Sequence, residues 1–531
     1  MVTAWVAFPL VLGLLGFGCG ALVERAAGRE LPLSVRLPCG VALTIGVLDL
    51  FTRSTSTVGA AIPAVCALAA GGLVFRPPWR WRPLDRALVA PALVFAAYAA
   101  PIVLSGSATW AGYVKLDDTA TWLALVDRTL SAGHTLAGLT PSTYTDTLAS
   151  YLTSGYPVGS FLPLGLGHAF LGTDIAWLTD PWMAFAGAML ALSLHRIASR
   201  ALGDRAPRWQ APAIAAVAAQ PALLYGYYLW GGMKEMTGAM LVAAFASTVP
   251  LAWEGRHGEP DSPQGTDGSR LAVERSRSPS ADASHRPSVV HHARAAIPAL
   301  VVVWGILSAL SGGGLVWLLP GGALSLLALS QRNGPRLPPT RLLVRGAAAV
   351  AVVGGLAAYL ALRPGGFVAA NESVLTGGKE LGNLLAPLHL RQVVGIWLSG
   401  DFRTTPTSAL LTDVLIVVAT LAALAGLVVA IRRAWTELTF YVLCSLTGAA
   451  IVFVLGSPWL GGKALATASP AVGLAALVAC ATALTPRAQG SIPLRVLAGV
   501  AGAAIVVGVV WSNILGYHDV YLAPRAQFAE L

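Results

Sequence analysis

The chain has 531 residues, of which 56% are hydrophobic and 11% are charged, and its mean hydropathy is +0.68. A soluble globular protein carries about 25% charged residues, so this composition excludes an ordinary soluble domain and indicates a protein embedded in lipid. The net charge of +10 comes from arginines in short loops between hydrophobic blocks, where they set membrane topology, so we expect no nucleic-acid partner.

Apolar blocks of about 17–24 residues recur along the chain, and each is long enough for a helix to cross a hydrocarbon core of roughly 30 Å. Inside that core only helices and closed barrels satisfy the backbone, and these blocks lack the alternation of barrel strands. The sequence therefore predicts an all-α, polytopic transmembrane helical bundle of about 11–14 spans. The predicted spans cover residues 3–23, 37–51, 57–75, 86–105, 174–195, 210–229, 233–253, 296–311, 314–330, 343–362, 408–431, 435–456, 464–484 and 495–512.

The basic loops between these spans predict the topology. Four strongly basic connections belong in the cytoplasm by the positive-inside rule: residues 76–86, 196–208, 332–345 and 432–433. The predicted spans then place the remaining basic connections, 25–36 and 487–495, on the same side. The outward segments are 106–173, 363–407, three short turns at 52–56, 231–232 and 456–462, and the tail from 513. We expect a multi-pass protein of the plasma membrane.

Two segments depart from the pattern of spans. Residues 157–172 are apolar but short and contain two prolines, and we interpret them as re-entrant or interfacial. Residues 254–295 are rich in Ser, Pro, Gly and Arg, so they cannot bury enough apolar surface to fold alone, and we expect a disordered cytoplasmic insert.

Lysine is the rarest charged residue of the chain and the most informative one. All four lysines (Lys115, Lys234, Lys379 and Lys463) fall in outward segments, and three of them follow glycines. Lysine presents a compact point charge that suits a phosphate, whereas arginine prefers planar bidentate pairing. The alternative is that four residues fall on one side by chance.

An acidic pair, Asp117 and Asp118, follows the fourth predicted span. A carboxylate at the mouth of a membrane cavity can act as a general base on an acceptor hydroxyl, or hold a divalent cation such as Mg or Mn. Adjacent side chains on a helix diverge by about 100°, so we expect one of the two to face a site. The alternative is that Asp118 caps a helix that runs through Trp122.

Further candidate binding residues lie in the other outward segments. Glu235 accompanies Lys234 at the start of a span, directly after an aromatic run that we interpret as an interfacial belt. Lys463 follows two glycines, whose exposed backbone N–H groups suit anions. In the second long segment His389 and Arg391 accompany Lys379, together with Glu380, Asp401 and Arg403; we expect one or two of these to contact a ligand.

Five stretches together carry a resemblance to a family: KLDDTATW, SGYPVGSFLPLG, LWGGMKE, SPWLGGKALATASP and YHDVYLAPR. With the topology and the acidic pair, they make the chain resemble the GT-C superfamily of membrane glycosyltransferases, and more closely large uncharacterised actinobacterial membrane proteins of this type. The resemblance spans most of the chain. It implies a GT-C-like fold and transfer of a sugar from a polyprenyl-phosphate-linked donor to a cell-envelope glycan or lipid acceptor, by inverting direct displacement on the extracytoplasmic side.

The resemblance also implies roles for residues. Asp117 or Asp118 would be the general base or would position the acceptor. Lys234, Lys463 and Arg391 would neutralise the carrier phosphate as it leaves.

In the family the acidic motif usually follows the first span, whereas here it follows the fourth. We therefore expect residues 1–80 to be an accessory group of transmembrane helices and residues 86–512 to be the catalytic core. Residues 513–531 are expected as a short extracytoplasmic tail, and the soluble C-terminal domain that many family members carry is either absent or has been cut away.

A transporter or flippase of lipid-linked sugars is the main alternative. It predicts internal repeats and functional charges near the bilayer midplane, whereas the sequence has no clear repeat and its notable charges lie near the outer boundary. Asp49 is an exception to this placement of charges, because it lies inside the second predicted span. A polymerase or ligase of lipid-linked glycans, and a scaffold without activity, also stay open.

Overall fold

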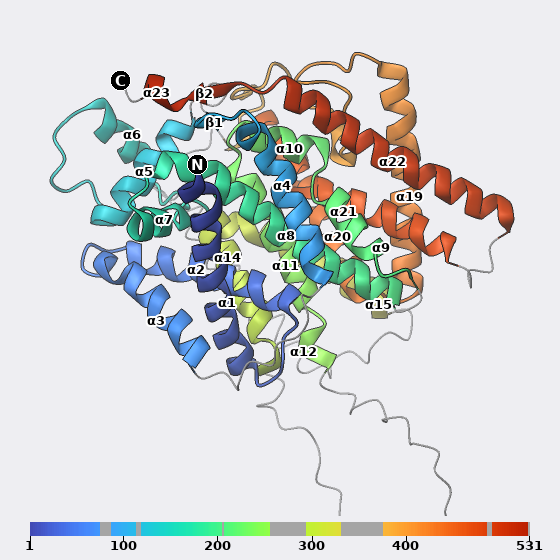
Figure 1. Ribbon diagram of the computed structural model, residues 1–531, viewed down its shortest axis with the longest axis horizontal. Helices are drawn as coiled ribbons and strands as arrows, with labels where there is room; N and C mark the ends of the chain where they lie inside the picture. Colours follow the sequence, from blue (N-terminus) through green and yellow to red (C-terminus); the bar gives the residue numbers. More distant parts are fainter. Residues whose placement is uncertain are drawn as a thin grey trace, which may run out of the picture.

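The computed structural model describes residues 1–74, 86–112, 118–203, 206–254, 294–330, 375–485 and 491–528, and these are almost entirely helical (Figure 1). The helices are α1 (Phe8–Ala27, preceded by the π-helical turn Thr3–Ala7), α2 (Leu33–Thr52), α3 (Ala61–Val74), α4 (Val89–Val103), α5 (Asp118–Ala132), α6 (Thr143–Leu152), α7 (Pro163–Leu171), α8 (Thr179–Leu202), α9 (Gln210–Ala218), α10 (Ala222–Leu229), α11 (Met233–Thr248), α12 (Leu251–Glu254), α14 (Ile297–Leu310), α15 (Gly314–Ser330), α19 (Ala409–Arg432), α20 (Thr436–Leu455), α21 (Pro458–Leu484), α22 (Ile492–His518) and α23 (Arg525–Phe528). Short 3₁₀ turns are η2 (Val58–Ala60), η3 (Arg86–Leu88), η4 (Ile175–Leu178), η6 (Ser311–Gly313) and η7 (Leu390–Val394).

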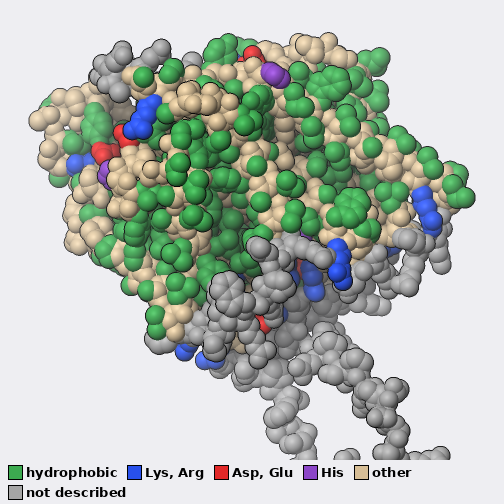
Figure 2. All heavy atoms as spheres, viewed as in Figure 1, with side chains coloured by type: hydrophobic (Ala, Val, Ile, Leu, Met, Phe, Trp, Pro, Cys, Tyr) green, Lys and Arg blue, Asp and Glu red, His purple; other side chains and the backbone are tan. Residues whose placement is uncertain are grey.

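Eight helical stretches within the described ranges are long and apolar enough to cross a membrane, and two shorter apolar helices, Val58–Val74 and Val89–Val103, accompany them. Figure 2 shows hydrophobic side chains over most of the visible face, with the few charged ones towards its edges. An all-α bundle with several candidate spans is therefore confirmed. The predicted span 343–362 lies outside the described residues.

One of the eight stretches, Ile297–Ser330, consists of two helices rather than one. The backbone turns at Ser311, which has a positive φ of 53°. A Cβ placed on Gly314 would lie 3.2 Å from the carbonyl oxygen of Ile306, eight residues earlier. Eight residues of continuous helix would separate these positions by about 12 Å, so the chain turns sharply between α14 and α15, and the two helices then pack on different partners, α2 and α20. The turn agrees with the prediction of two separate spans, 296–311 and 314–330.

The predicted span 210–229 is broken in the structure into α9 and α10. Pro221 lacks the N–H that a continuous helix needs, and it precedes the first residue of α10. The freed backbone groups find other partners: Ala222 N donates to Gly395 O at 2.8 Å, and Asn513 Nδ2 donates to Gln220 O at 2.8 Å. The break therefore ties the second long outward segment and α22 to the bundle.

The segments that the sequence places outside meet at the upper end of the molecule in Figure 1, where both chain termini lie. The strands β1 (Thr109–Ala111) and β2 (Leu522–Pro524) pair there in antiparallel register. Gly159 N donates to Ser308 O at 3.2 Å, and Ser457 N donates to Leu375 O at 2.8 Å. Three outward segments and the C-terminal tail thus share one end.

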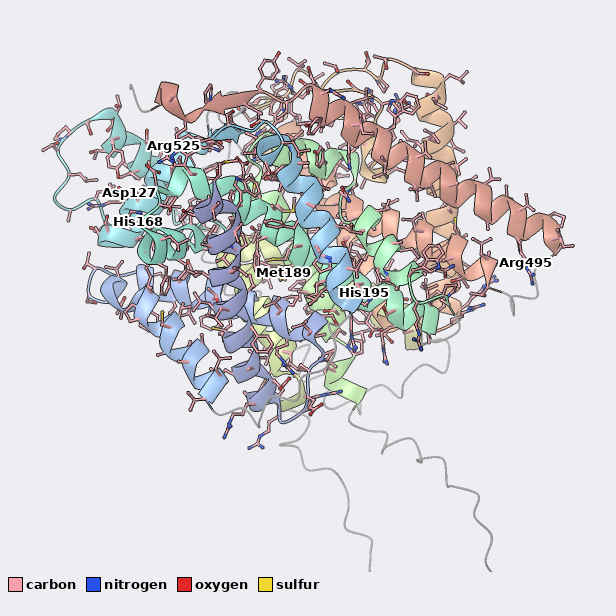
Figure 3. All side chains as sticks on the ribbon, viewed as in Figure 1. Asp127, His168, Met189, His195, Arg495 and Arg525 are labelled. Carbon is pink, nitrogen blue, oxygen red and sulfur yellow. The ribbon has the colours of Figure 1, made fainter. Side chains whose placement is uncertain are left out.

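Segments predicted to be cytoplasmic meet at the lower end. Arg29 Nη1 donates to Leu251 O at 3.0 Å, and Arg200 Nε lies 3.2 Å from Glu437 Oε1. In Figure 3 Arg525, Asp127 and His168 lie towards the upper end, Met189 lies midway, and His195 lies lower along the same helix as Met189. The arrangement agrees with the prediction that the outward and the cytoplasmic segments lie at opposite ends of the bundle. Which of the two ends faces the outside stays a prediction.

The apolar stretch 157–172 contains α7, a helix of nine residues. Nine residues rise about 14 Å, which is half of a hydrocarbon core, so α7 does not cross it. Trp182 Nε1 donates to Ser160 O at 2.8 Å, which holds the segment against α8. The predicted insert 254–295 lies almost wholly outside the described residues.

Helices α1, α2 and α3 approach each other through glycines. A Cβ on Gly40 of α2 would lie 1.7 Å from Gly16 O of α1, and one on Gly72 of α3 would lie 1.9 Å from Gly18 O. Small residues permit this backbone contact, which is a common way for helices to associate in lipid. Helix α2 also packs on α8 and α14, and the division into accessory helices 1–80 and core 86–512 stays a prediction.

We predict that Gly40→Ala lowers the thermal unfolding midpoint of the detergent-purified protein, because the added methyl group forces α1 and α2 apart at a cost of about 1–3 kcal/mol. Gly13→Ala is the control, since a Cβ there meets nothing within 4 Å. Equal midpoints for the two variants would contradict the close α1–α2 contact.

Candidate functional site

A cavity at the upper end gathers aromatic and charged side chains from four outward segments. Its lining includes Trp122 and Phe161 from the first long segment, Asn383, Leu384 and Phe402 from the second, and residues at the starts of α11 and α21. The full lining is Trp122, Phe161, Tyr227, Trp230, Gly231, Gly232, Met233, Lys234, Glu235, Asn383, Leu384, Phe402, Trp459 and Lys463.

Two glycines between α10 and α11 place Lys234 and Glu235 in this cavity. Gly231 has a φ of +84°, a conformation that favours glycine, and its backbone abuts Gly112, where a Cβ would lie 2.6 Å from Gly231 N. Gly232 is the N-cap of α11, so no side chain caps the helix, and Met233 N donates instead to the backbone oxygen of Gly231 at 2.8 Å. Lys234 and Glu235 follow in the first helical turn.

Each cavity lysine lies over the face of an aromatic ring. Lys234 Nζ is 3.4 Å from the centre of the Tyr156 ring, and Lys463 Nζ is 3.5 Å from the centre of the Trp459 ring. Burial, aided by nearby phenol and carboxylate groups, raises the pKa of Tyr156 well above its usual value, so its ring stays neutral. Ring faces hold an ammonium group in place without neutralising its charge.

Glu235 forms the ion pair of the cavity. Its Oε1 lies 3.5 Å from Lys463 Nζ, and the two side chains are only 4% and 15% exposed. Lys234 also lies within the electrostatic reach of Glu235 and Lys463. With both lysines protonated, the lining carries two positive charges and one negative charge. Because a buried excess charge is costly, this balance favours an anionic ligand.

Aromatic rings form two walls of the cavity. In the first wall Trp122 stacks on Tyr156 and on Phe161, with ring centres 5.2 Å apart in each case. In the second wall Phe402 stacks on Tyr227 at 4.9 Å and meets Trp230 edge-on at 5.1 Å. The sequence identified Tyr227 and Trp230 only as interfacial aromatics. Their role as a wall depends on Phe402, which is distant in sequence.

Arg403 fixes the second long segment over the cavity. Its guanidinium lies 3.9 Å from the centre of the Trp230 ring, pairs with Asp401 at 2.8 Å and donates to Asn383 O at 3.0 Å. These three contacts join Asn383 and Phe402, both of which line the cavity, to Trp230 at the end of α10. Arg403 therefore positions the cavity wall.

The acidic pair lies at the edge of the described structure. Asp118 begins α5, is partly exposed, and its charge acts on both Lys234 and Tyr156. A helix was predicted through Trp122, and α5 confirms it. Asp117 and Lys115 lie outside the described residues.

Three other predicted binding residues lie away from the cavity lining. Lys379 and His389 are exposed, and Arg391 pairs with Asp413 and lies 5.4 Å from the Trp397 ring. The guanidinium of Arg391 therefore already has a carboxylate partner, Asp413. Asp49, the charged residue inside the second predicted span, lies in the last turn of α2 and pairs with Arg53 at 2.7 Å.

No group of three or more His, Cys, Asp or Glu side chains that could hold a metal ion occurs in the part of the chain that the structure describes. The predicted cation ligand Asp117 is not in that part. A divalent cation on the acidic pair is therefore a prediction that the described residues neither support nor contradict.

The hydroxyl of Tyr227 is buried, and no hydrogen-bond partner is found for it among the described residues. It lies at the cavity, against the backbone of Gly462. The next residue, Tyr228, donates its hydroxyl to Tyr98 O at 2.5 Å. Buried polar atoms are nearly always paired, so the Tyr227 hydroxyl suggests a place for a ligand atom.

The chain matches no protein-family model, and comparisons with curated proteins and with solved structures found no match.

We predict that Tyr227→Phe leaves the thermal midpoint of the ligand-free protein unchanged or slightly higher, because it removes an unpaired hydroxyl. Tyr228→Phe should lower the midpoint, since it leaves Tyr98 O without its donor at a cost of about 1–3 kcal/mol. Thermal unfolding of both variants in the same detergent measures the difference. A larger loss for Tyr227→Phe would mean that this hydroxyl already has a structural partner.

Proposed function

We propose that the chain is a membrane glycosyltransferase that moves a sugar from a polyprenyl-phosphate-linked donor to a glycan or lipid acceptor on the extracytoplasmic side of the plasma membrane. One observation carries the proposal: two ring-held lysines and one glutamate converge with two aromatic walls in a cavity at one end of a helical bundle.

The charges of the cavity suit the donor phosphate. A phosphodiester carries one negative charge, which balances the one excess positive charge of Lys234, Lys463 and Glu235. The ammonium groups keep N–H donors for phosphate oxygens because their ring contacts use none. The uncapped start of α11 adds backbone N–H groups and the positive end of the helix dipole.

The aromatic walls suit the sugar. A sugar ring has apolar faces and polar edges, and the rings of Trp122, Tyr227 and Phe402 offer apolar surface beside polar groups. The Tyr227 hydroxyl and the Asn383 side chain would then contact sugar or phosphate oxygens.

The acidic pair supplies the proton acceptor of the proposed reaction. The acceptor hydroxyl oxygen attacks the anomeric carbon of the donor sugar, and its proton passes to Asp118 or Asp117. The bond from the anomeric carbon to the phosphate oxygen breaks, and the phosphate leaves with the electron pair among the lysines. The charge of Asp118 already acts on Lys234, which supports its placement beside the reacting groups.

A transporter or flippase of lipid-linked sugars could use the same cavity. It would also need charged groups that are reachable from both ends, with functional charges near the midplane. The cavity charges lie in the first turns of α11 and α21, at one end of both helices, and this placement favours transfer over transport.

We predict sugar transfer from polyprenyl-phosphate sugars by the purified protein, with turnover reduced at least 100-fold in Lys463→Met and in Lys234→Met, because each loses a charge that stabilises the leaving phosphate. The side chain of Met keeps the length and apolar stem of Lys. Arg433→Met is the matched control, since Arg433 also lies over a tryptophan ring, 5.4 Å from the centre of Trp435, but at the lower end.

The acidic pair is tested in the same assay with Asp118→Asn and Asp117→Asn. Loss of a general base reduces turnover by about 100- to 10,000-fold, so at least one variant should fall by that factor. Wild-type turnover in both variants would remove the acid–base role. Movement of lipid or sugar across vesicle membranes without transfer would establish the transporter instead.

A further inference from the structure

A second cavity lies at the upper end, where four segments far apart in the sequence meet. Its lining comes from the start of the chain, the approach to β1, the turn between α7 and η4, and α23. Arg525 N donates to Ala108 O at 2.9 Å beside the β1–β2 pair, and Trp110 meets Trp177 edge-on at 5.9 Å. These contacts, together with the packing of the turn Thr3–Ala7 on α7, hold the four segments together.

The lining of this second cavity combines aromatic surface with hydrogen-bonding side chains. Trp5 and Trp177 supply the rings, and the guanidinium of Arg525 lies 5.3 Å from the centre of the Trp177 ring. One oxygen of Asp174 accepts from Ala176 N at 2.8 Å, which leaves its second oxygen for other donors. Threonine hydroxyls complete the polar part: Thr3, Thr109 and Thr173.

The second cavity carries charges of both signs. Its lining side chains supply one positive charge, on Arg525, and one negative charge, on Asp174, and Met1 adds its N-terminal ammonium group. Paired charges that offer both donors and acceptors, next to tryptophan rings, suit a neutral ligand with many hydroxyl groups.

The two cavities are joined by the short stretch that contains β1. Thr109 lines the second cavity, and the backbone of Gly112 abuts Gly231 in the lining of the first. Three residues span at most about 10 Å, so the two linings approach each other within the length of a few sugar units. Figure 3 shows Arg525 at this upper end.

We infer that the second cavity is a carbohydrate-binding site that holds the outer sugar units of an oligosaccharide acceptor, while the end that receives the new sugar lies in the first cavity. Binding of carbohydrate follows from the second cavity alone. Only its role as an acceptor site rests on the proposed function.

The test is binding of the full-length, detergent-purified protein to an array of linear and branched oligosaccharides of hexoses and pentoses, followed by titration of the best-bound oligosaccharide. We expect Arg525→Ala and Asp174→Asn to weaken binding at least 10-fold, since hydrogen bonds to charged groups contribute about 1.5–3 kcal/mol. Asp174→Asn keeps an oxygen that can cap Ala176, so it separates ligand binding from folding. Arg433→Ala is the control, because that arginine has a similar tryptophan contact at the lower end.

The inference is overturned if the wild-type protein binds no oligosaccharide at millimolar concentration, or if Arg525→Ala and Asp174→Asn bind as tightly as wild type. It is also overturned if Arg525→Ala changes only the retention of anionic lipid. Oligosaccharide binding that depends on Arg525 in a protein without transfer activity would instead reject the proposed function and leave the carbohydrate site in place.

Discussion

Hydrocarbon surroundings tolerate neither an unpaired charge nor an unpaired backbone group, and this constraint decides where polar chemistry can occur in the chain. Several charges within or beside the helices are paired near the helix ends, as Asp49 is with Arg53 and Glu437 with Arg200. Lys463 is likewise balanced by Glu235. A site with a net charge can therefore form only at an end of the bundle, where outward segments cover it.

The site depends on how two helices begin. Helix α11 starts at a pair of glycines that bring the chain against Gly112, and α21 starts at a short turn that the second long segment covers. Both starts place a lysine within the first two turns, and an aromatic ring faces each ammonium group. The rings position these cations without neutralising them, so their charge stays available to a ligand.

Hydrophobic length and basic loops predicted most spans, because both are local properties of the sequence. The break between α14 and α15 and the short α7 follow from length and glycine content alone. The aromatic walls could not be predicted, since Trp122 and Tyr156 are distant in sequence and Phe402 meets rings from another segment. Arg391 was predicted to bind phosphate, but its carboxylate partner, Asp413, is 22 residues away and nothing in the local pattern indicates the pairing. Spacing identified Lys234, Glu235 and Lys463 as candidates, yet only the packing shows that they share one cavity.

Both cavities lie at the end of the bundle that we propose faces the outside of the cell, and cysteine accessibility measures this orientation. Four of the five native cysteines are buried and the fifth is partly buried, so the background labelling of the folded chain is low. Lys379→Cys, at an exposed position of the upper end, should react with a membrane-impermeant maleimide in intact cells. Trp209→Cys, at a 67% exposed position of the lower end, should react only after the membrane is opened. The reverse pattern would contradict the topology and, with it, an extracytoplasmic site.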